Sequence, residues 1–463
     1  MRIPATPPRT SELLEKYGDQ PNQPNRLIEL IKSGIGEQSA GTYLHWDELR
    51  HRSAPPGFSH EEWWLATKLA RRPMARPLPF RDKAGRSFSY CAPDRVQSLL
   101  HDVDRNAAGD IQIPELVTTP QNRDRYIVRS LMEEAINSSQ LEGAATTHKV
   151  AKDMLQRGRK PRDKGEQMIM NNYAAMQFIR DRYKQPLTPE IILELQRTLT
   201  IETLDDASAA GRWRRPDEDI TVADIRSNET LHIPPPAEEI PARMELLCRF
   251  ANDRTDEPFV HPVVRAILLH FMLGYDHPFA DGNGRTARAL FYWCMAQRGY
   301  WLLEFVSISG VIKRAPAQYV RAYLYTETDD SDTTYFLLHQ LDALKEAIAE
   351  LHEYLRRKVD EQRHAQQLIG HSPVLHERLN YRQLALLDHA LRNPQSVYKI
   401  DRHQSSHHVT YQTARTDLLD LVDLGLLTKS KAGRAFIFIA PEDLRARLEA
   451  IRSGYSSTTV GRS

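Results

Sequence analysis

The chain is poor in cysteine and has no long hydrophobic run, and each absence excludes a class of protein. Its three cysteines, Cys91, Cys248 and Cys294, are scattered over 463 residues, which excludes a disulfide framework and a cysteine metal site. No stretch of about eighteen apolar residues exists, which excludes a membrane-spanning helix. The first residues lack the apolar centre of a secretory signal. We therefore expect a cytoplasmic protein with reduced thiols and no membrane partner.

The chain also lacks an excess of charge of either sign. Its 62 lysines and arginines are balanced by 61 aspartates and glutamates, which leaves a net charge of +1. No overall field therefore attracts nucleic acid or an anionic membrane, and only a local basic patch can do so. The hydrophobic content of 41% is ordinary for a globular protein. The length predicts about two to four domains.

The most informative segment that is present runs from His277 to Arg288. It combines a histidine, a carboxylate, a Gly-Asn-Gly turn and two arginines, and apolar residues at helical spacing lie on both sides. We therefore predict a loop between two buried helices, with Gly284 opening the second. A helix N-terminus and flexible glycines favour a bound anion, and arginine forks match phosphate oxygens. Each residue alone has an ordinary structural explanation, but their combination indicates phosphate chemistry.

The segment resembles the signature of the Fic family, His-x-Phe-x-(Asp/Glu)-Gly-Asn-Gly-Arg-x-x-Arg, at every defined position. This resemblance implies the transfer of AMP from ATP to a Ser, Thr or Tyr hydroxyl of a protein. His277 would be the general base, Asp281 would hold Mg²⁺, and Phe279 would anchor the loop in the core. The phosphates would be bound by Gly282, Asn283, Gly284, Arg285 and Arg288, with both arginines projecting from one face toward the start of the second helix.

A second segment, from Ser138 to Gly143, follows an apolar helical stretch. Taken alone it predicts a helix end, with Gly143 as the stop. It also resembles the inhibitory-helix pattern of the Fic family, (Ser/Thr)-x-x-x-Glu-(Gly/Asn). In that family the glutamate pairs with the second arginine of the signature and hinders the γ-phosphate. The resemblance therefore implies that Ser138 and Glu142 restrain the site through Arg288.

Between these segments, residues 219–224 and 231–236 are β-prone and flank a polar turn, which predicts a hairpin. Fic-like proteins have a flap at this place that binds an extended target segment by strand addition. The alternative is a surface hairpin without a role. Thr188 and Pro189 predict a helix start. The Fic pattern has a histidine where this chain has Gln196, and we expect that departure to affect packing rather than chemistry.

The last part of the chain has a different pattern. A helix around Leu384, a turn at 397–400, a second helix from Thr410 to Gly425 and a hairpin that ends at Ile439 resemble a winged helix-turn-helix. Acidic side chains on the second helix dilute its charge, so a role in protein contacts is an equal alternative. The candidate DNA contacts are Gln412, Arg415, Lys429, Lys431 and Arg434.

We therefore predict a mainly α-helical protein in three parts. Residues 1–105 would form an N-terminal α+β module, 106–365 a Fic catalytic domain with the inhibitory helix and the flap, and 372–445 the winged helix-turn-helix domain. Short helices are expected at 43–49 and 61–66, a hairpin at 80–90 and a long helix at 336–359.

The predicted function is protein AMP transfer from ATP with Mg²⁺, held in check by Glu142. Two alternatives stay open. The same site could remove AMP or transfer another nucleotidyl or phosphoryl moiety, or the chain could be a DNA-binding regulator that senses nucleotide. A protein substrate bound through the flap is the expected partner, and self-modification, DNA and a homodimer are further ones.

Overall fold

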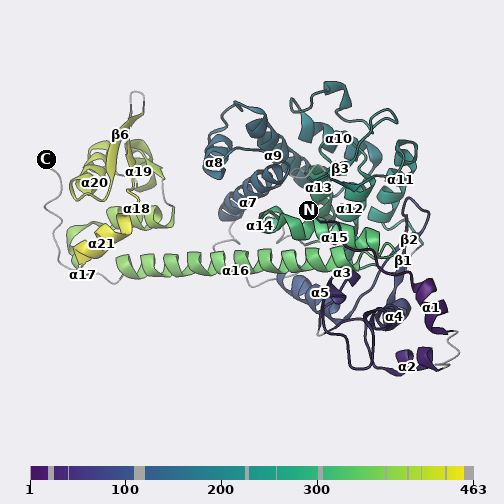
Figure 1. The fold of residues 1–463 in the computed structure, drawn as a ribbon. Helices are drawn as coiled ribbons and strands as arrows, with labels where there is room; N and C mark the ends of the chain where they lie inside the picture. The colour runs from purple at the N-terminus through teal and green to yellow at the C-terminus, as the bar shows by residue number, and fades with distance from the viewer. Residues whose placement is uncertain are drawn as a thin grey trace. The chain divides into compact units, whose positions relative to one another are not determined.

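The structure is a computed structural model that describes residues 2–18, 25–39, 41–108, 120–224, 229–256, 258–300, 306–370, 373–393, 396–407, 409–432 and 435–452. The chain divides into two compact units, Met1–Leu351 and His352–Ser463. Helices dominate both units and the strands are few and short, so the mainly helical class predicted from the sequence is confirmed (Figure 1).

The N-terminal part of the first unit contains the predicted short helices and hairpin. Its elements are α1 (Thr10–Gly18), α2 (Arg26–Lys32), α3 (Trp46–Leu49), α4 (His60–Arg71), a 3₁₀ turn (Arg72–Met74), β1 (Arg76–Arg81), β2 (Ser87–Tyr90) and α5 (Asp94–Ala107). The Arg71 guanidinium lies 3.6 Å from the centre of the Tyr43 ring and donates to the Tyr335 hydroxyl at 2.8 Å. Tyr335 lies in the first turn of the long helix α16, so this part packs directly on the helical body.

The helical body supplies the remaining elements of the first unit. Besides the 3₁₀ turns Ala207–Ala209 and Ala237–Glu239, they are α7 (Pro120–Leu141), α8 (His148–Arg157), α9 (Lys164–Arg182), α10 (Pro189–Thr200), α11 (Ile240–Ala251), α12 (Pro262–Asp276), α13 (Asn283–Gln297), α14 (Ile308–Arg314), α15 (Pro316–Thr328) and the first part of α16 (Thr334–Gly370), which continues past Leu351 into the second unit. A hairpin of β3 (Val222–Ala223) and β4 (Thr230–His232) interrupts them. The predicted hairpin and long helix are therefore confirmed, and the residues 225–228 of the hairpin turn lie outside the described part.

Two central helices position the signature segment. In α12 every residue from Val263 to Leu273 is buried, as expected for a helix that is apolar on nearly all sides. Its partner α13 packs against it (Figure 1). The predicted start of α13 at Gly284 is one residue late, because the helix begins at Asn283 behind Gly282, whose φ is 86°. A left-handed φ of this kind favours glycine, so Gly282 makes the sharp entry into α13.

The end of α7 carries the second segment. The helix ends at Leu141, and Gly143 adopts a φ of 93°. The N–H of Gly143 donates to the Gln140 carbonyl at 3.2 Å, and that of Ala144 donates to the Ser139 carbonyl at 3.0 Å. This is a Schellman end with glycine in the left-handed position, as the sequence predicts. Glu142 follows the last helical residue and is free to project from the helix end.

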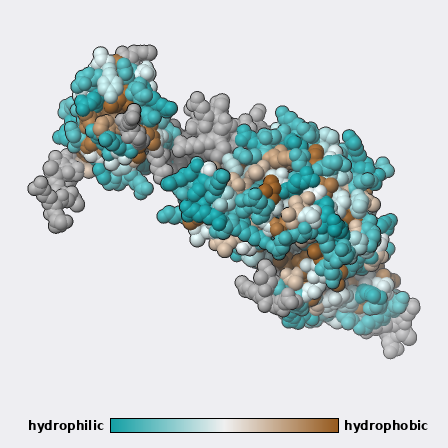
Figure 2. All heavy atoms as spheres, turned by 90° about the horizontal axis from the view of Figure 1, so that it is seen from above, coloured by the Kyte–Doolittle hydropathy of each residue, from teal (hydrophilic) through white to brown (hydrophobic). Residues whose placement is uncertain are grey.

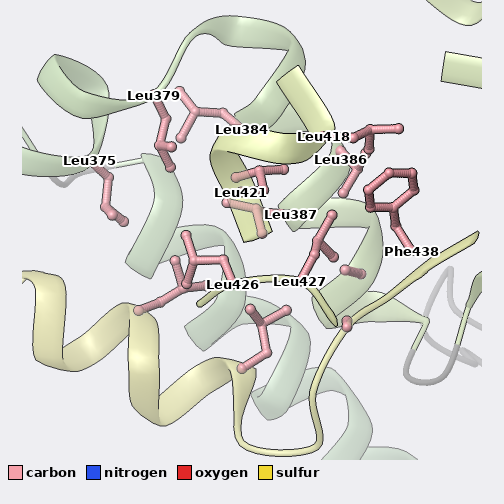
Figure 3. Close-up of a cluster of buried hydrophobic side chains, with 14 of the residues drawn as sticks. Leu375, Leu379, Leu384, Leu386, Leu387, Leu418, Leu421, Leu426, Leu427 and Phe438 are labelled. Carbon is pink, nitrogen blue, oxygen red and sulfur yellow. The ribbon is translucent and has the colours of Figure 1, made fainter. Parts of the chain in front are cut away.

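The second unit contains α17 (Pro373–Arg378), α18 (Tyr381–Arg392), β5 (Val397–Tyr398), α19 (Ile400–His407), α20 (Tyr411–Asp423), β6 (Thr428–Ala432), β7 (Ala435–Ile439) and α21 (Leu444–Arg452). The strands form one antiparallel sheet in the order β5-β7-β6. The prediction of a turn at 397–400 is therefore wrong. The strand β5 lies there, and the helix α19, which we did not predict, follows it. Leucines from α18 and α20 and Phe438 from β7 form the core (Figure 3).

The outer surface is mostly polar. Hydrophilic residues predominate on the face shown in Figure 2, and hydrophobic ones are scattered among them. Across the residues that the structure describes, no helix combines the length and the apolar character that crossing a bilayer requires.

Candidate functional site

The loop from His277 to Gly282 joins α12 to α13 and is braced from within. His277 caps α12 with a φ of 47°, a conformation uncommon for residues other than glycine. Phe279 is fully buried, as expected for a core anchor. The Asn283 side chain accepts from the Phe279 N–H at 2.9 Å and donates to the Phe279 carbonyl at 2.8 Å. The Asn283 amide is therefore occupied inside the loop, and an anion would meet the backbone N–H groups that begin α13.

The His277 imidazole is arranged as a neutral base. Its Nδ1 lies 3.1 Å from the Gly274 carbonyl, which can only accept, so Nδ1 carries the proton and Nε2 keeps a lone pair. Burial lowers the pKa of His277 to about 4. The side chain therefore stays uncharged at neutral pH and can accept a proton through Nε2.

Asp281 is the exposed carboxylate of the loop. Its side chain is 50% exposed, Oδ1 accepts from the Gly282 N–H at 2.5 Å, and the Arg285 guanidinium lies 3.4 Å away. No group of three or more His, Cys, Asp or Glu side chains in the described ranges could hold a metal by itself. Mg²⁺ often binds through one or two carboxylates together with water and substrate phosphates, and Asp281 beside a helix N-terminus fits that kind of site.

The two arginines of the segment face different helices. Arg285 is 1% exposed and donates to the Leu199 carbonyl at the end of α10 at 2.8 Å. Arg288 is 2% exposed and faces α7. Their hydrogen bonds therefore go to different helices, but both guanidinium groups lie beside the start of α13, as the spacing predicts. A Cβ added at Gly282 would lie 3.8 Å from Arg285, and one added at Gly284 would lie 3.2 Å from Arg288.

Arg288 is held by the second segment. Its Nε donates to the Ser138 hydroxyl at 2.8 Å, and its terminal nitrogen donates to the Ser138 carbonyl at 3.1 Å and to Glu142 at 2.7 Å. A side chain at Gly284 would collide with this Glu142 carboxylate. The carboxylate therefore occupies space directly over the first turn of α13, where an incoming anion would be placed.

The charge on Glu142 is stabilised by this contact. Burial by itself would raise the pKa of the Glu142 carboxyl, but the Arg288 guanidinium outweighs burial and holds the pKa below its ordinary value. The carboxylate is thus ionised throughout the neutral range. The arginine side chain of this pair is 3% exposed and the glutamate side chain 32% exposed, so the carboxylate competes with any phosphate that needs the same guanidinium.

Two residues that hold the loop in place were missed as site residues. The Arg214 N–H donates to the Pro278 carbonyl at 2.8 Å, and its Nε donates to the His277 carbonyl at 2.9 Å. Gln196 contacts the backbone of Asp281. The segment Gly211–Arg214 stood out in the sequence as the stretch before the hairpin, but no local signal pairs it with a loop so far along the chain.

The hairpin is attached to the same region through His232 on β4. Its Nε2 lies 2.7 Å from the Tyr275 carbonyl, and its Nδ1 lies 2.8 Å from the Glu327 carboxylate on α15. Beyond the strand, Ile233 is 55% exposed. The hairpin is therefore anchored beside the end of α12 that carries His277.

The candidate DNA contacts lie in the second unit. Gln412 and Arg415 are exposed on α20, and Lys429 and Lys431 are exposed on β6. The Lys429 ammonium group lies 4.1 Å from the centre of the Phe436 ring. Arg434, the remaining candidate contact, lies outside the described residues.

Comparison with known proteins agrees with the loop geometry. Residues 186–295 match the Fic/DOC family, a range that includes α10, α12 and the whole loop but not Glu142. Over 235 residues the chain is 25% identical to the protein adenylyltransferase Fic of Nematostella vectensis, which covers 49% of this chain and 51% of that relative. The relative of the same name in Drosophila ananassae is 32% identical over 117 residues, which is 25% of this chain and 21% of that one.

A solved structure of a Fic family protein from Desulfovibrio desulfuricans is 18% identical with a TM-score of 0.49, covering 76% of this chain and 98% of that chain. The chain spans about half the length of the first of the curated relatives, 51%, and much less of the other. The intact signature in its braced loop lies inside the stretch that matches, so residues 186–295 are identified as a Fic/DOC family domain.

Proposed function

We propose that the chain is a protein adenylyltransferase that moves AMP from ATP to a Ser, Thr or Tyr hydroxyl of a protein. The observation that carries the proposal is a neutral His277 with a free Nε2 at the head of a loop that ends in a helix N-terminus. The names of the two relatives, both protein adenylyltransferases, agree with it. Activity, substrate and partners all remain part of the proposal.

The proposed reaction uses His277 as the base. Nε2 takes the proton of the target hydroxyl, the hydroxyl oxygen forms a bond to the α-phosphorus of ATP, and the bond to the β-phosphate breaks with pyrophosphate leaving. Asp281 would hold Mg²⁺, which supplies charge neutralisation at the phosphates when bound. The backbone of Gly282, Asn283 and Gly284 would receive phosphate oxygens at the start of α13.

In the proposed mechanism Glu142 restrains this reaction. Arg288 must release the Glu142 carboxylate before it can hold the γ-phosphate. Arg285 would contribute to phosphate binding through Asp281, the carboxylate that it contacts. The protein substrate would pair with the hairpin that His232 anchors beside the loop. In self-modification the Ser, Thr or Tyr hydroxyl that receives AMP would belong to this chain.

The proposal is tested with ATP labelled at the α-phosphate. The Glu142→Gly variant should transfer label to protein in the presence of Mg²⁺, and mass spectrometry should locate it on a hydroxyl residue. Adding His277→Ala should reduce the rate by about 10²–10⁴-fold while ATP still binds. Label transfer that is unchanged without His277 would exclude this mechanism. Labelling by a γ-phosphate probe instead would favour another moiety, and loss of AMP from a modified protein would favour the reverse activity.

A second candidate function is DNA binding by the second unit, which we propose to be a winged helix. The observation in its favour is the position of Asp417. This residue is one of the acidic side chains of α20 that dilute the positive charge of a DNA-binding helix. Asp417 is 3% exposed and is paired with Arg382 at 2.7 Å. It therefore faces the core rather than the surface that carries Gln412 and Arg415.

The test uses the full chain and fluorescently labelled duplex DNA. Binding should weaken as salt rises, because lysines and arginines release counterions from the phosphates. Arg415→Ala combined with Lys429→Ala should weaken binding about tenfold or more. The matched control removes Arg95 and Lys345, two exposed cations of the first unit. Equal affinity of the two double variants would favour the protein-contact alternative.

A further inference from the structure

Gln196 is a buried polar side chain without an obvious reason to be polar. It lies on α10 and is 0% exposed. The other buried residues of this helix are mainly apolar. Its Nε2 donates to the Asp281 carbonyl at 3.1 Å, and its Oε1 accepts from the Gly211 N–H at 2.6 Å. Both ends of the amide are therefore satisfied by backbone groups from two different segments.

The orientation of this amide is fixed by its partners. The Gly211 N–H can only donate and must face Oε1, and the Asp281 carbonyl can only accept and must face Nε2. A purely apolar side chain of the same volume could fill the space but would leave both partly buried backbone groups without this partner. The bridge is therefore specific to a group with a donor at one end and an acceptor at the other.

The segment at the other end of the bridge holds the opposite side of the loop. Gly211 belongs to the same short stretch as Arg214, which contacts the carbonyls of His277 and Pro278. The stretch therefore contacts the His277 backbone directly and reaches the Asp281 backbone through Gln196. The backbones of His277 and Asp281, at the two ends of the loop, are therefore both bonded to the segment Gly211–Arg214, the second of them through Gln196.

We propose that Gln196 is a positioning residue that sets the place of Asp281 relative to His277. It does so by joining the Asp281 backbone to the Gly211–Arg214 segment that already holds His277. This inference rests on the proposed function, because it assigns the purpose of the bridge to the base and to the candidate magnesium ligand. It differs from the expectation that the departure at Gln196 affects packing rather than chemistry.

The test compares three substitutions in the Glu142→Gly protein. Gln196→Met keeps the volume and removes both hydrogen bonds. Gln196→Leu also removes both hydrogen bonds, with a branched side chain of similar size. Gln196→His restores a donor and an acceptor in the neutral ring. Thr198→Ala is the control, because Thr198 lies on the same helix and bonds only to the Glu194 carbonyl.

Two measurements decide the matter. In hydrogen exchange, the peptide that covers residues 278–286 should exchange at least about tenfold faster in Gln196→Met and Gln196→Leu than in the control, since a hydrogen bond worth about 1.5 kcal/mol is lost. In calorimetry, the affinity for ATP should fall about tenfold with Mg²⁺ and change little in EDTA, as partners behind a metal ligand typically have such effects. Gln196→His should recover most of the protection of the loop from exchange and most of the affinity for ATP with Mg²⁺.

Unchanged exchange in the loop of a folded variant would overturn the inference, and so would an equal loss of affinity with and without Mg²⁺. If Gln196→Met does not fold, Gln196→Leu decides by the same criteria. The exchange measurement needs no nucleotide, so it stands even if the Glu142→Gly parent transfers no AMP. Failure of the proposed function and failure of this inference are therefore distinguishable.

Discussion

Replacing Glu142 with glycine should release the restraint on the site, and the structure indicates by how much. Glu142 is bound to Arg288 at 2.7 Å, and the arginine side chain is only 3% exposed. Hydrogen bonds to charged groups contribute about 1.5–3 kcal/mol, and about 1.4 kcal/mol corresponds to a factor of ten. A γ-phosphate that no longer competes with the carboxylate should therefore gain about 10- to 100-fold in productive binding, and AMP transfer should rise by the same factor.

The substitution is clean in structural terms. Glu142 follows the last residue of α7, so glycine there does not interrupt the helix. Arg288 keeps its bonds to Ser138 but loses its carboxylate, so the variant should melt at a lower temperature. Added Mg²⁺ and ATP should recover more of that melting temperature in the variant than in the wild type, because the freed arginine binds the nucleotide better.

The assay is transfer of label from ATP with Mg²⁺, and the matched control is Glu133→Gly. Glu133 lies on the same helix and pairs with His148, not with Arg288. Glycine there weakens α7 by about 1 kcal/mol without freeing the arginine. If Glu133→Gly raises transfer as much as Glu142→Gly does, loosening of the helix is the cause and the ion pair is not. If neither variant exceeds the wild type, Glu142 is only a helix-end residue.

Three further predictions follow from the charges in the two units. Because burial lowers the pKa of His277 to about 4, AMP transfer by the Glu142→Gly variant should stay nearly constant from about pH 5.5 to 8 and fall only below about pH 5, as a pH–rate profile would show. The pKa of Glu142 lies below its ordinary value, so its ion pair with Arg288 is present above that ordinary value and is lost only as the pH falls through the lowered pKa. The ratio of Glu142→Gly activity to wild-type activity should therefore be constant above about pH 6. Asp417→Ala leaves Arg382 without its buried partner and should lower the stability of the second unit by about 2–3 kcal/mol in thermal melts, whereas a melting curve that is unchanged would exclude a structural role for this pair.

Much of the site was predictable because it depends on neighbours along the chain. The helix–loop–helix around His277 follows from apolar spacing and from the glycines between the two apolar stretches. The end of α7 follows from Gly143, since a left-handed residue stops a helix locally. The start of α10 is capped by Thr188 with Pro189 in the first position, as the sequence predicts.

Other features could not be read from any local pattern. Gln196 looks like a simple departure from the family pattern until α10 is packed under the loop and meets Asp281. The spacing of Arg285 and Arg288 places both near the start of α13, but it does not reveal that Arg285 donates to α10 and Arg288 to α7. The strand at 397–398 is too short to stand out in the sequence and exists because it pairs with β7.

The sequence by itself determined the chemistry that the loop can offer and where its helices begin and end. These depend on backbone preference, capping and apolar periodicity, which act over a few residues. Only the tertiary structure decided which groups are in use. It placed the Glu142 carboxylate over the start of α13, turned Asp417 into the core and made Gln196 a bridge. The physical reason is that a buried polar group takes its partner from whichever segment packs against it, and that segment is set by the whole fold.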